Sequence, residues 1–266
     1  MRLAIFFNNS RGYLLLKKLK KKHIISLAIL SSKFLNKKYI SQLKKMKINF
    51  LIVKNVNDNK IFLLIKKLKI DLNIVAGFPY ILNKKLICSA KYKSINLHAG
   101  PIPSYRGGSP LNWQIINGED KIYLSIIKMT EKIDKGKLLA EGKFKLKNFD
   151  TITSVKKKAD NLFCKLIDDA IKNIINNKII VSKTKKENRY FKQRTIKDSL
   201  INFNQLTAKE VFNRFRACEK PYEAFYLNLN KKIIIKNLKI LKKNENSKKN
   251  KHRIFRCKKN FVLVSY

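Results

Sequence analysis

The sequence predicts an α/β protein, in which a doubly wound, mostly parallel sheet with helices is followed by a small β-rich subdomain. Three observations predict this class. Short apolar runs of strand length alternate with helix-length amphipathic segments from the N-terminus onward. Six of the eight glycines and three of the five prolines lie between Ser94 and Gly142, which indicates ligand-shaping loops rather than core. Near the C-terminus, apolar runs follow one another after a single short helix.

The strands and helices of the sheet are predicted in alternating order. The predicted strands are Leu3–Phe7, Ile24–Leu30, Asn49–Val53, Leu72–Ala76, Ser94–His98 and Tyr123–Met129. The predicted helices are Tyr13–Lys22, Tyr39–Lys47, Lys60–Leu68 and a long helix over Ser154–Asn176. The turn that follows the first strand lacks the Gly-x-Gly-x-x-Gly pattern, so a dinucleotide site is not expected.

The chain is predicted to divide into a catalytic domain (1–182), a linker (183–196) and a small β-rich subdomain (197–266). A short helix is expected over Ala208–Ala217. Three apolar runs follow it, at Ala224–Leu229, Lys232–Ile240 and Phe261–Val264. The polar tract Lys242–Lys251 is expected to form a loop.

The net charge of +44 raises the question of a polyanionic partner. Only nine of the 61 basic residues are Arg, and the lysines run through every segment. A surface that recognises phosphates tends to use Arg and to be concentrated on one face. Because Asn and Ile are abundant as well as Lys, we interpret the charge as codon bias toward A and T, with a solvated surface. A functional polyanion partner is the alternative, and weak, salt-sensitive binding to polyanions is expected in either case.

The four cysteines are widely separated and form no Cys-x-x-Cys pair, so neither a disulfide framework nor a metal site is expected. The apolar run Leu3–Phe7 is too short for a signal peptide. No window reaches the roughly 20 apolar residues that cross a bilayer. We therefore expect a soluble, cytoplasmic protein.

Three distinctive segments follow predicted strands, namely Gly77–Tyr80, Asn96–Arg106 and Thr130–Gly136. Ligands bind beyond the carboxyl ends of strands in such sheets, so we expect the three segments to converge there. Asn96 and His98 are two residues apart and should point to one side of their strand. A carboxylate from Asp134 could orient the imidazole, and an amide could stabilise an oxyanion. This set, without Ser or Cys, suggests acyl transfer to an external nucleophile, although each residue could equally be structural.

These segments resemble the signature of the N10-formyltetrahydrofolate-dependent formyltransferases. The matching motifs are Asn96-Leu97-His98, Pro103-Ser104-Tyr105-Arg106-Gly107 and Ile133-Asp134-Lys135-Gly136. Lys54–Asn57 and, in the small subdomain, Phe215–Ala217 and Pro221–Phe225 extend the resemblance to about Leu229. Two departures stand out: Gly100-Pro101-Ile102-Pro103 replaces the usual Ser-Leu-Leu-Pro, and Gly108 stands where sugar-modifying relatives often have a second Arg.

The resemblance implies a role for each part of the site. Asn96, His98 and Asp134 would be catalytic, with the proton transfers divided between His98 and Asp134 in a way that differs among family members. The formyl donor would be N10-formyltetrahydrofolate, with no metal. Its binding residues would be Tyr80, Ile81, Leu82, Ile102, Pro103, Thr130, Glu131, Lys132 and Ile133. The acceptor would contact Tyr105, Arg106, Trp113, Arg216 and Tyr222.

Two branches of the family differ in the amine that they formylate. One acts on a nucleotide-linked amino sugar, as in UDP-4-amino-4-deoxy-L-arabinose formyltransferases, and the other on methionyl-tRNA. Pro110–Trp113 with Ile116–Glu119 resembles the sugar branch. The short Ser31–Lys38 connection and the small C-terminal segment also favour it over the tRNA enzymes, whereas the positive charge favours tRNA. A third possibility is a non-catalytic, basic RNA-binding module on the same fold.

Overall fold

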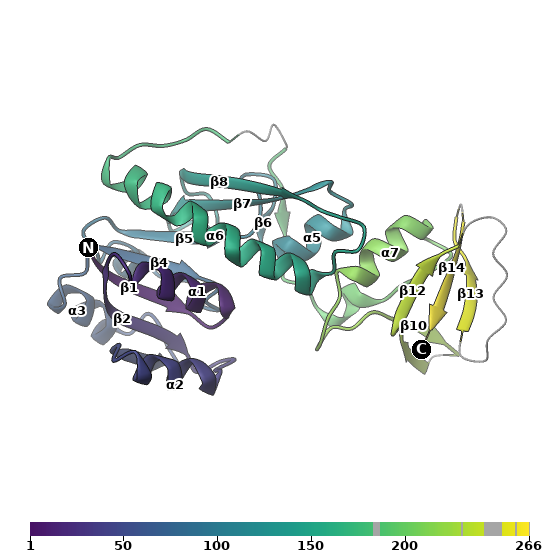
Figure 1. The fold of residues 1–266 in the computed structure, drawn as a ribbon, viewed down its shortest axis with the longest axis horizontal. Helices are drawn as coiled ribbons and strands as arrows, with labels where there is room; N and C mark the ends of the chain where they lie inside the picture. The colour runs from purple at the N-terminus through teal and green to yellow at the C-terminus, as the bar shows by residue number, and fades with distance from the viewer. Residues whose placement is uncertain (183–186, 230, 242–251, 259, 266) are drawn as a thin grey trace. The chain divides into compact units, whose positions relative to one another are not determined.

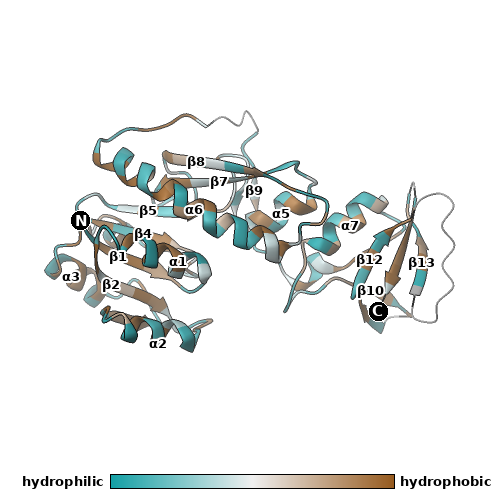
Figure 2. Cartoon of the chain, in the orientation of Figure 1, coloured by the Kyte–Doolittle hydropathy of each residue, from teal (hydrophilic) through white to brown (hydrophobic). Residues whose placement is uncertain are grey.

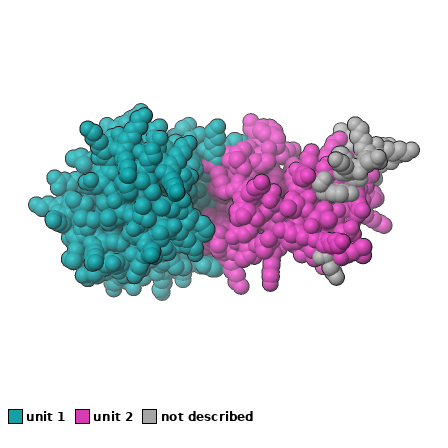
Figure 3. All heavy atoms as spheres, turned by 90° about the horizontal axis from the view of Figure 1, so that it is seen from below, with its two compact units in different colours: residues 1–106, 123–143, 157–190 teal, residues 107–122, 144–156, 191–266 magenta. Residues whose placement is uncertain are grey.

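The computed structural model describes residues 1–182, 187–229, 231–241, 252–258 and 260–265 (Figure 1). The predicted loop over Lys242–Lys251 and residues 183–186 of the predicted linker lie outside the described residues. Clustering of contacts divides the chain into two compact units, coloured separately in Figure 3. Unit 1 comprises residues 1–106, 123–143 and 157–190, and unit 2 comprises residues 107–122, 144–156 and 191–266.

A seven-stranded sheet has the order β3-β2-β1-β4-β5-β7-β8. Its strands are β1 (Arg2–Phe7), β2 (Ile24–Ser31), β3 (Phe50–Val53), β4 (Leu72–Ala76), β5 (Ser94–His98), β7 (Lys121–Lys128) and β8 (Leu138–Lys145). The pairs β1–β2, β2–β3, β1–β4 and β4–β5 are parallel, whereas β5 and β7 are antiparallel. The prediction of a doubly wound, mostly parallel sheet is therefore confirmed.

The helices between the first strands begin at polar caps. They are α1 (Ser10–Leu19), α2 (Lys37–Lys45) and α3 (Asn59–Lys67). The side chains of Asn9, Asn36 and Asp58 accept backbone N–H groups at their starts, and lysines occupy each last turn, where the helix dipole favours cations. The strands β1, β2 and β4 are almost entirely buried, whereas β3 at the edge of the sheet is only partly buried, and β2 is drawn largely in the hydrophobic colour in Figure 2.

The long helix α6 (Ile152–Ile175) packs beside α1 in unit 1. Lys18 of α1 lies 2.9 Å from the carboxylate of Asp168 in α6. Val155, Ala159, Phe163, Ile167 and Ala170 are fully buried along α6, at the spacing of one helix face. Predicted helix ends differ from observed ends by up to three residues, because capping by residues such as Asn9 starts α1 at Ser10 rather than at Tyr13.

Several short elements were not predicted. They are α4 (Lys84–Ile87), α5 (Pro110–Ile116), β6 (Arg106–Gly107), β8, β9 (Tyr190–Phe191), a 3₁₀ helix over Ile196–Ser199 and, near the C-terminus, β13 (His252–Arg256). The strand β8 lacks regular alternation and ends in Lys143, Phe144 and Lys145, so its pattern resembled a loop. Part of the predicted linker therefore has structure, since β9 pairs with β6.

The C-terminal strands build two small antiparallel sheets after α7 (Ala208–Arg216). One contains β10 (Phe225–Asn228) and β11 (Lys231–Ile234), and the other has the order β12-β14-β13. The strands of the second are β12 (Asn237–Ile240), β13 (His252–Arg256) and β14 (Phe261–Ser265). The predicted single run Lys232–Ile240 is thus wrong, because it divides between two sheets. The β-rich prediction is confirmed, and no helix in the described ranges is long and apolar enough to cross a membrane.

Candidate active site

The central side chains come from the end of β5. Asn96 and His98 alternate with the buried Leu97, so they lie on one face of the strand. The backbone of β5 is held on both sides, because it pairs with β4 and with β7, where Asn96 faces Ile127 and His98 faces Ser125. His98 is 5% exposed, whereas Asn96 is half-buried. A buried strand thus fixes the positions of both polar side chains.

The loop over residues 129–136 does not follow the expected path. We expected Thr130–Gly136 to lie at the same sheet edge as the carboxyl end of β5. Because β7 is antiparallel to β5, its last residue, Lys128, pairs with Ile95, and the N–H of Met129 donates to the carbonyl of Ser94. The loop leaves the sheet beside the start of β5 and returns along it toward His98. The convergence of the three segments is therefore achieved by the loop and not by the strand end.

Two backbone features define the conformation of this loop. Asp134 has a φ of 49°, in the left-handed region, which costs free energy for a residue with a side chain. Gly136 lies against the backbone of β7, and a Cβ atom there would be 1.6 Å from the carbonyl oxygen of Lys128. Only glycine allows this approach. The turn that carries Asp134 therefore depends on the absence of a side chain two residues later.

Asp134 contacts both polar residues of β5. Its Oδ2 lies 3.3 Å from Nδ1 of His98, and its Oδ1 accepts a hydrogen bond of 3.4 Å from Nδ2 of Asn96. The opposite ring nitrogen, Nε2 of His98, lies 2.6 Å from the carbonyl oxygen of Tyr105. The structure therefore brings the three predicted catalytic residues together around one carboxylate.

The environment of His98 has two opposing effects on its proton affinity. Burial lowers the pKa of the imidazole below its ordinary value, since the charged form loses hydration, and the positive charge of Arg11 acts in the same direction. The Asp134 carboxylate and the Tyr105 carbonyl oppose this by favouring the protonated ring, and the net direction is downward. Both ring nitrogens face acceptors, whereas a neutral imidazole has one N–H. This arrangement suits a group that gains and loses a proton during a reaction.

A cavity of about 200 Å³ in unit 1, here called the loop cavity, lies beside this cluster. It is lined by Val75, Phe78, Tyr80, Ile81, Leu82, Asn96, Ile127, Met129, Thr130, Glu131, Lys132, Ile133, Asp134 and Gly136. Seven of the nine predicted folate-binding residues are in this lining, and Ile102 and Pro103 are not. The volume is below the range typical of whole drug-sized ligands, so it suits one ring system of a larger molecule.

Sequence reasoning did not name four apolar residues of this lining, which are Val75, Phe78, Ile127 and Met129. Phe78 packs edge-to-face on Phe6 and on Tyr80, with ring centroids 5.6 Å apart in both pairs. Phe78 lies in the segment Gly77–Tyr80 that was expected at the site, and Met129 was placed at the end of a predicted strand, so their places beside strands were the available signal.

The loop after β5 contains four further predicted site residues. Ile102 and Pro103 are half-buried, and the carbonyl of Pro103 accepts the N–H of Arg189. Tyr105 is 4% exposed and contacts His98 through its backbone. Nε of Arg106 is buried and has no hydrogen-bond partner in the described part of the chain. An unsatisfied buried guanidinium donor is costly, and it could be satisfied by an anionic ligand.

The other three predicted acceptor residues lie in unit 2. Trp113 donates from Nε1 to the Lys192 carbonyl at 3.0 Å and stacks on Phe191. Arg216 is buried, and its guanidinium donates to Oδ1 of Asn213 and to the Lys147 carbonyl. Tyr222 is 40% exposed. Trp113 and Arg216 therefore have packing roles within unit 2, and a role toward the acceptor stays a prediction.

Comparison with known proteins identifies the family. Residues 5–171 match the model of the formyl transferase domain, which is more than half of the chain. The chain belongs to the formyl transferase family. This confirms the resemblance drawn from Asn96-Leu97-His98 and the motifs that follow it.

Two curated relatives match most of this chain. The bifunctional polymyxin resistance protein ArnA of Wigglesworthia glossinidia brevipalpis is 37% identical over 198 residues, covering 74% of this chain and 30% of that protein. A methionyl-tRNA formyltransferase of Finegoldia magna is 30% identical over 225 residues, covering 82% of this chain and 70% of that protein. The chain thus spans less than a third of the first relative and about two thirds of the second.

A solved structure of similar fold spans nearly the whole chain. It is an N-formyltransferase from Helicobacter canadensis in complex with folinic acid and dTDP-3-aminofucose. The TM-score is 0.72 at 18% identity, and the match covers 99% of this chain and 98% of that one. At this identity the similarity shows a shared fold.

Proposed function

We propose that this formyltransferase moves the formyl group of N10-formyltetrahydrofolate to the primary amine of a nucleotide-linked amino sugar. The observation that carries the chemistry is the contact of the Asp134 carboxylate with both Asn96 and His98, in the wall of the loop cavity. In this proposal the enzyme acts in the cytoplasm, in the synthesis of a surface glycan such as lipopolysaccharide.

The loop cavity supports the binding of the folate ring. Phe78, Leu82 and Ile127 provide apolar surface for the flat body of a pterin. The backbone of Thr130–Asp134 provides peptide donors and acceptors for its hydrogen-bonding edge. The pterin end of the donor would therefore occupy the loop cavity and place the formyl group near Asn96 and His98.

The proposed reaction is an acyl transfer without a covalent enzyme intermediate. The amine nitrogen attacks the formyl carbon, and the carbonyl electrons move to oxygen to give a tetrahedral oxyanion. Nδ2 of Asn96 donates to this oxyanion, and protonated His98 donates to it from Nε2 in exchange for its contact with the Tyr105 carbonyl. The bond between the carbon and N10 then breaks. The amine loses one proton and N10 gains one, and His98 and Asp134 together transfer it. The division of this transfer between them is left open.

The sugar acceptor rests on weaker observations than the chemistry. The structural relative from Helicobacter canadensis contains a nucleotide-linked amino sugar and matches this chain from end to end. Nε of Arg106, which is buried and has no hydrogen-bond partner among the described residues, could donate to a phosphate of such a ligand. Only five residues separate β2 from α2, in accord with the short connection expected for the sugar branch.

Methionyl-tRNA is the second candidate acceptor. It is favoured by the Finegoldia magna relative and by the net charge of +44, which would attract RNA. A non-catalytic RNA-binding module is the remaining alternative. It leaves the cluster around Asp134 without a purpose, and we therefore place it last.

An acceptor panel tests the proposal. The whole chain is incubated with N10-formyltetrahydrofolate and either nucleotide-linked amino sugars or methionyl-tRNA, and tetrahydrofolate release is measured. We expect release with at least one amino sugar, and a fall of about 10³-fold in kcat/KM for His98→Gln. His23→Gln, which changes a histidine outside the cluster, should retain activity. If methionyl-tRNA is the only acceptor that is formylated, the sugar assignment is wrong. If no amine is formylated, the proposed enzymatic activity is wrong.

A further inference from the structure

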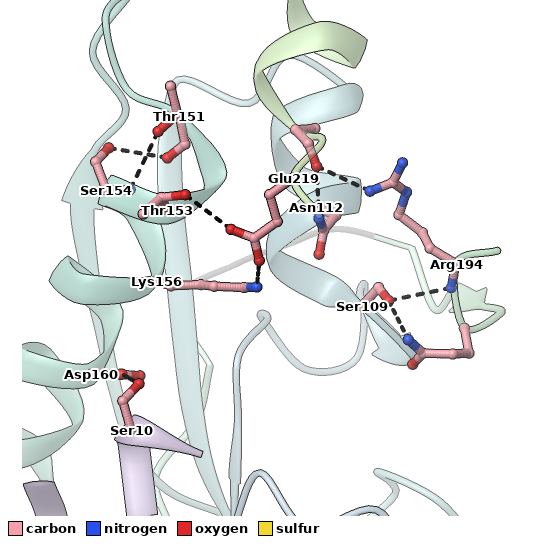
Figure 4. A network of polar contacts seen from close by, with 12 residues as sticks. Ser10, Ser109, Asn112, Thr151, Thr153, Ser154, Lys156, Asp160, Arg194 and Glu219 are labelled. Atoms are coloured by element: carbon pink, nitrogen blue, oxygen red, sulfur yellow. Dashed lines mark hydrogen bonds and ion pairs between the residues drawn. The ribbon is translucent and has the colours of Figure 1, made fainter. Parts of the chain in front are cut away.

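A buried ion pair lies behind the catalytic end of β5. Nε of Arg11, in the first turn of α1, lies 3.3 Å from Oδ1 of Asp160 in α6. The hydroxyl of Ser10 donates to the other oxygen of Asp160 at 2.5 Å, a contact drawn in Figure 4. The side chains of Arg11 and Asp160 are 12% and 5% exposed. Charges are rarely buried to this extent unless they are paired, and the pair is absent from our sequence-based site.

The sequence brings Arg11 unusually close to the sheet. The next residue, Gly12, lies where a Cβ atom would be 2.1 Å from Cβ of Phe7 and 3.1 Å from the carbonyl oxygen of Ala76. The first turn of α1 can therefore pack directly against the ends of β1 and β4. The guanidinium also lies over the ring of Phe163, 4.7 Å from its centroid, which further fixes its position.

Arg11 contacts the catalytic strand itself. Its Nη1 donates to the carbonyl of Leu97 at 3.4 Å, and Leu97 lies between Asn96 and His98. The peptide group between Leu97 and His98 therefore accepts a hydrogen bond from a cation that is itself fixed in position. The charge of Arg11 also acts on the imidazole of His98, where it opposes protonation.

We propose that Arg11 is a positioning residue for the catalytic strand, and that its pairing with Asp160 sets how readily His98 accepts a proton. This inference rests on the proposed function, because it assigns a purpose to the charge state of His98. Asp160 has two effects: it retains the guanidinium inside the protein, and it partly neutralises the charge that His98 experiences.

The groups that face His98 come from three directions. Asp134 faces Nδ1 from the loop after β7, the Tyr105 carbonyl faces Nε2 from the loop after β5, and Arg11 approaches from α1. Ser125, opposite His98 on β7, carries no charge. Asp134 and Arg11 are thus the charged groups acting directly on the ring, with opposite signs, and Asp160 acts through Arg11.

Histidine titration by NMR tests the inference without any substrate, so it is independent of whether formyl transfer is observed. The chain has three histidines, and His98→Gln assigns the His98 signal by its loss. In Arg11→Met a positive charge is removed, and the pKa of His98 should rise by about half a unit or more. In Asp160→Asn the positive charge is less compensated, and the pKa of His98 should fall. In Arg11→Lys, which keeps the charge, it should stay near the wild-type value.

Lys17→Met is the matched control, because it removes a lysine charge from the exposed face of the same helix. It should leave the His98 titration unchanged. Opposite shifts in Arg11→Met and Asp160→Asn support the inference, since a purely structural role would not reverse sign between them. Shifts in the same direction, or no shift with only a lower Tm, would overturn it. If Arg11→Met fails to fold, Asp160→Asn against Arg11→Lys gives the same test.

Discussion

The loop that carries Asp134 and the arginine cluster of unit 2, which consists of Arg194 and Arg216, use buried polar groups in different ways. At Asp134, side chains from separate elements contact one another beside a cavity. In unit 2, Arg194 donates to the Ala217 carbonyl at 3.0 Å and to Ser199, and Arg216 donates to Asn213 and the Lys147 carbonyl. These contacts hold both guanidinium groups within unit 2, although Nε of Arg194 is buried without a hydrogen-bond partner in the described part of the chain.

A further polar network in unit 2 has the same internal character. Figure 4 shows Glu219 between Thr153 and Lys156, with its two carboxylate oxygens directed to these two partners. Its neighbour Asn112 donates to the Ala217 carbonyl at 2.8 Å. The two regions differ in the partners of their buried polar groups. The Asp134 carboxylate contacts the two polar side chains of β5, whereas the guanidinium of Arg216 is bonded to Asn213 and to a backbone carbonyl. Arg216 and Glu219 also line a cavity of about 300 Å³ in unit 2, so a cavity alone does not distinguish the two regions.

Among substitutions outside the catalytic residues, the largest effect is expected where the loop is most constrained. Gly136→Ala would place a Cβ atom 1.6 Å from the Lys128 carbonyl, so the turn must move and take Asp134 with it. Misplacing a catalytic group by about 1 Å can cost about 10²-fold, and we expect that loss in kcat/KM. Formyl transfer kinetics with the acceptor found by the panel provide the measurement.

Gly142→Ala is the control for this prediction. A Cβ atom there would lie 2.8 Å from Cδ1 of Leu166, the flexible end of a side chain that can move aside. We expect activity close to that of the wild type. Equal losses in the two variants would show that the effect is general destabilisation of unit 1 and not the position of Asp134.

Substitutions in the arginine cluster should lower the free energy of unfolding rather than the rate of formyl transfer. Arg216→Met removes three charge-assisted hydrogen bonds and leaves Asn213 and the Lys147 carbonyl without this donor. We expect the free energy of unfolding to fall by about 2–3 kcal/mol. This is measured by urea denaturation of the protein, followed by a signal from residues of unit 2. Arg189→Met, which removes an exposed pair with Glu187, should cost less than about 1 kcal/mol. A large rise in acceptor KM without loss of stability would instead support the predicted acceptor role of Arg216.

The elements that were predicted correctly from the sequence are those with strong local sequence patterns. Buried strands such as Leu72–Ala76 and Ser94–His98 were predicted with their observed bounds, because continuous apolar runs next to turn residues have few other interpretations. The strand β8 and the antiparallel direction of β7 were missed. Strand direction depends on pairing with β5, which is distant in sequence, and no local pattern reports it.

The candidate site was predicted from residue types. Residues whose role depends on their contacts rather than on their type could not be identified in this way. Asn96, His98 and Asp134 could be selected because they lie in the Gly- and Pro-rich segments beside predicted strands and match the motifs of the family. The sequence could not distinguish Arg216, whose guanidinium is bonded internally, from Arg106, which has a buried and unpartnered Nε. It also did not reveal Arg11, because its partner Asp160 is distant in sequence and only the packing of α1 on α6 brings the two together.

The smallest expected effect is the dependence of stability on pH. Burial lowers the pKa of His98 below the ordinary value of about 6.5, so the unfolded chain binds a proton at a higher pH than the folded one. The free energy of unfolding should therefore fall as the pH falls below about 6.5. His98→Gln should remove part of this slope in urea denaturation between pH 7 and pH 5. His23 also has a pKa lowered by burial, but it is less enclosed, so His23→Gln should remove a smaller part. A steeper fall in His98→Gln than in the wild type would instead mean that Asp134 holds the imidazole protonated in the folded protein, and that the cluster stores the proton needed by the oxyanion before substrate binds.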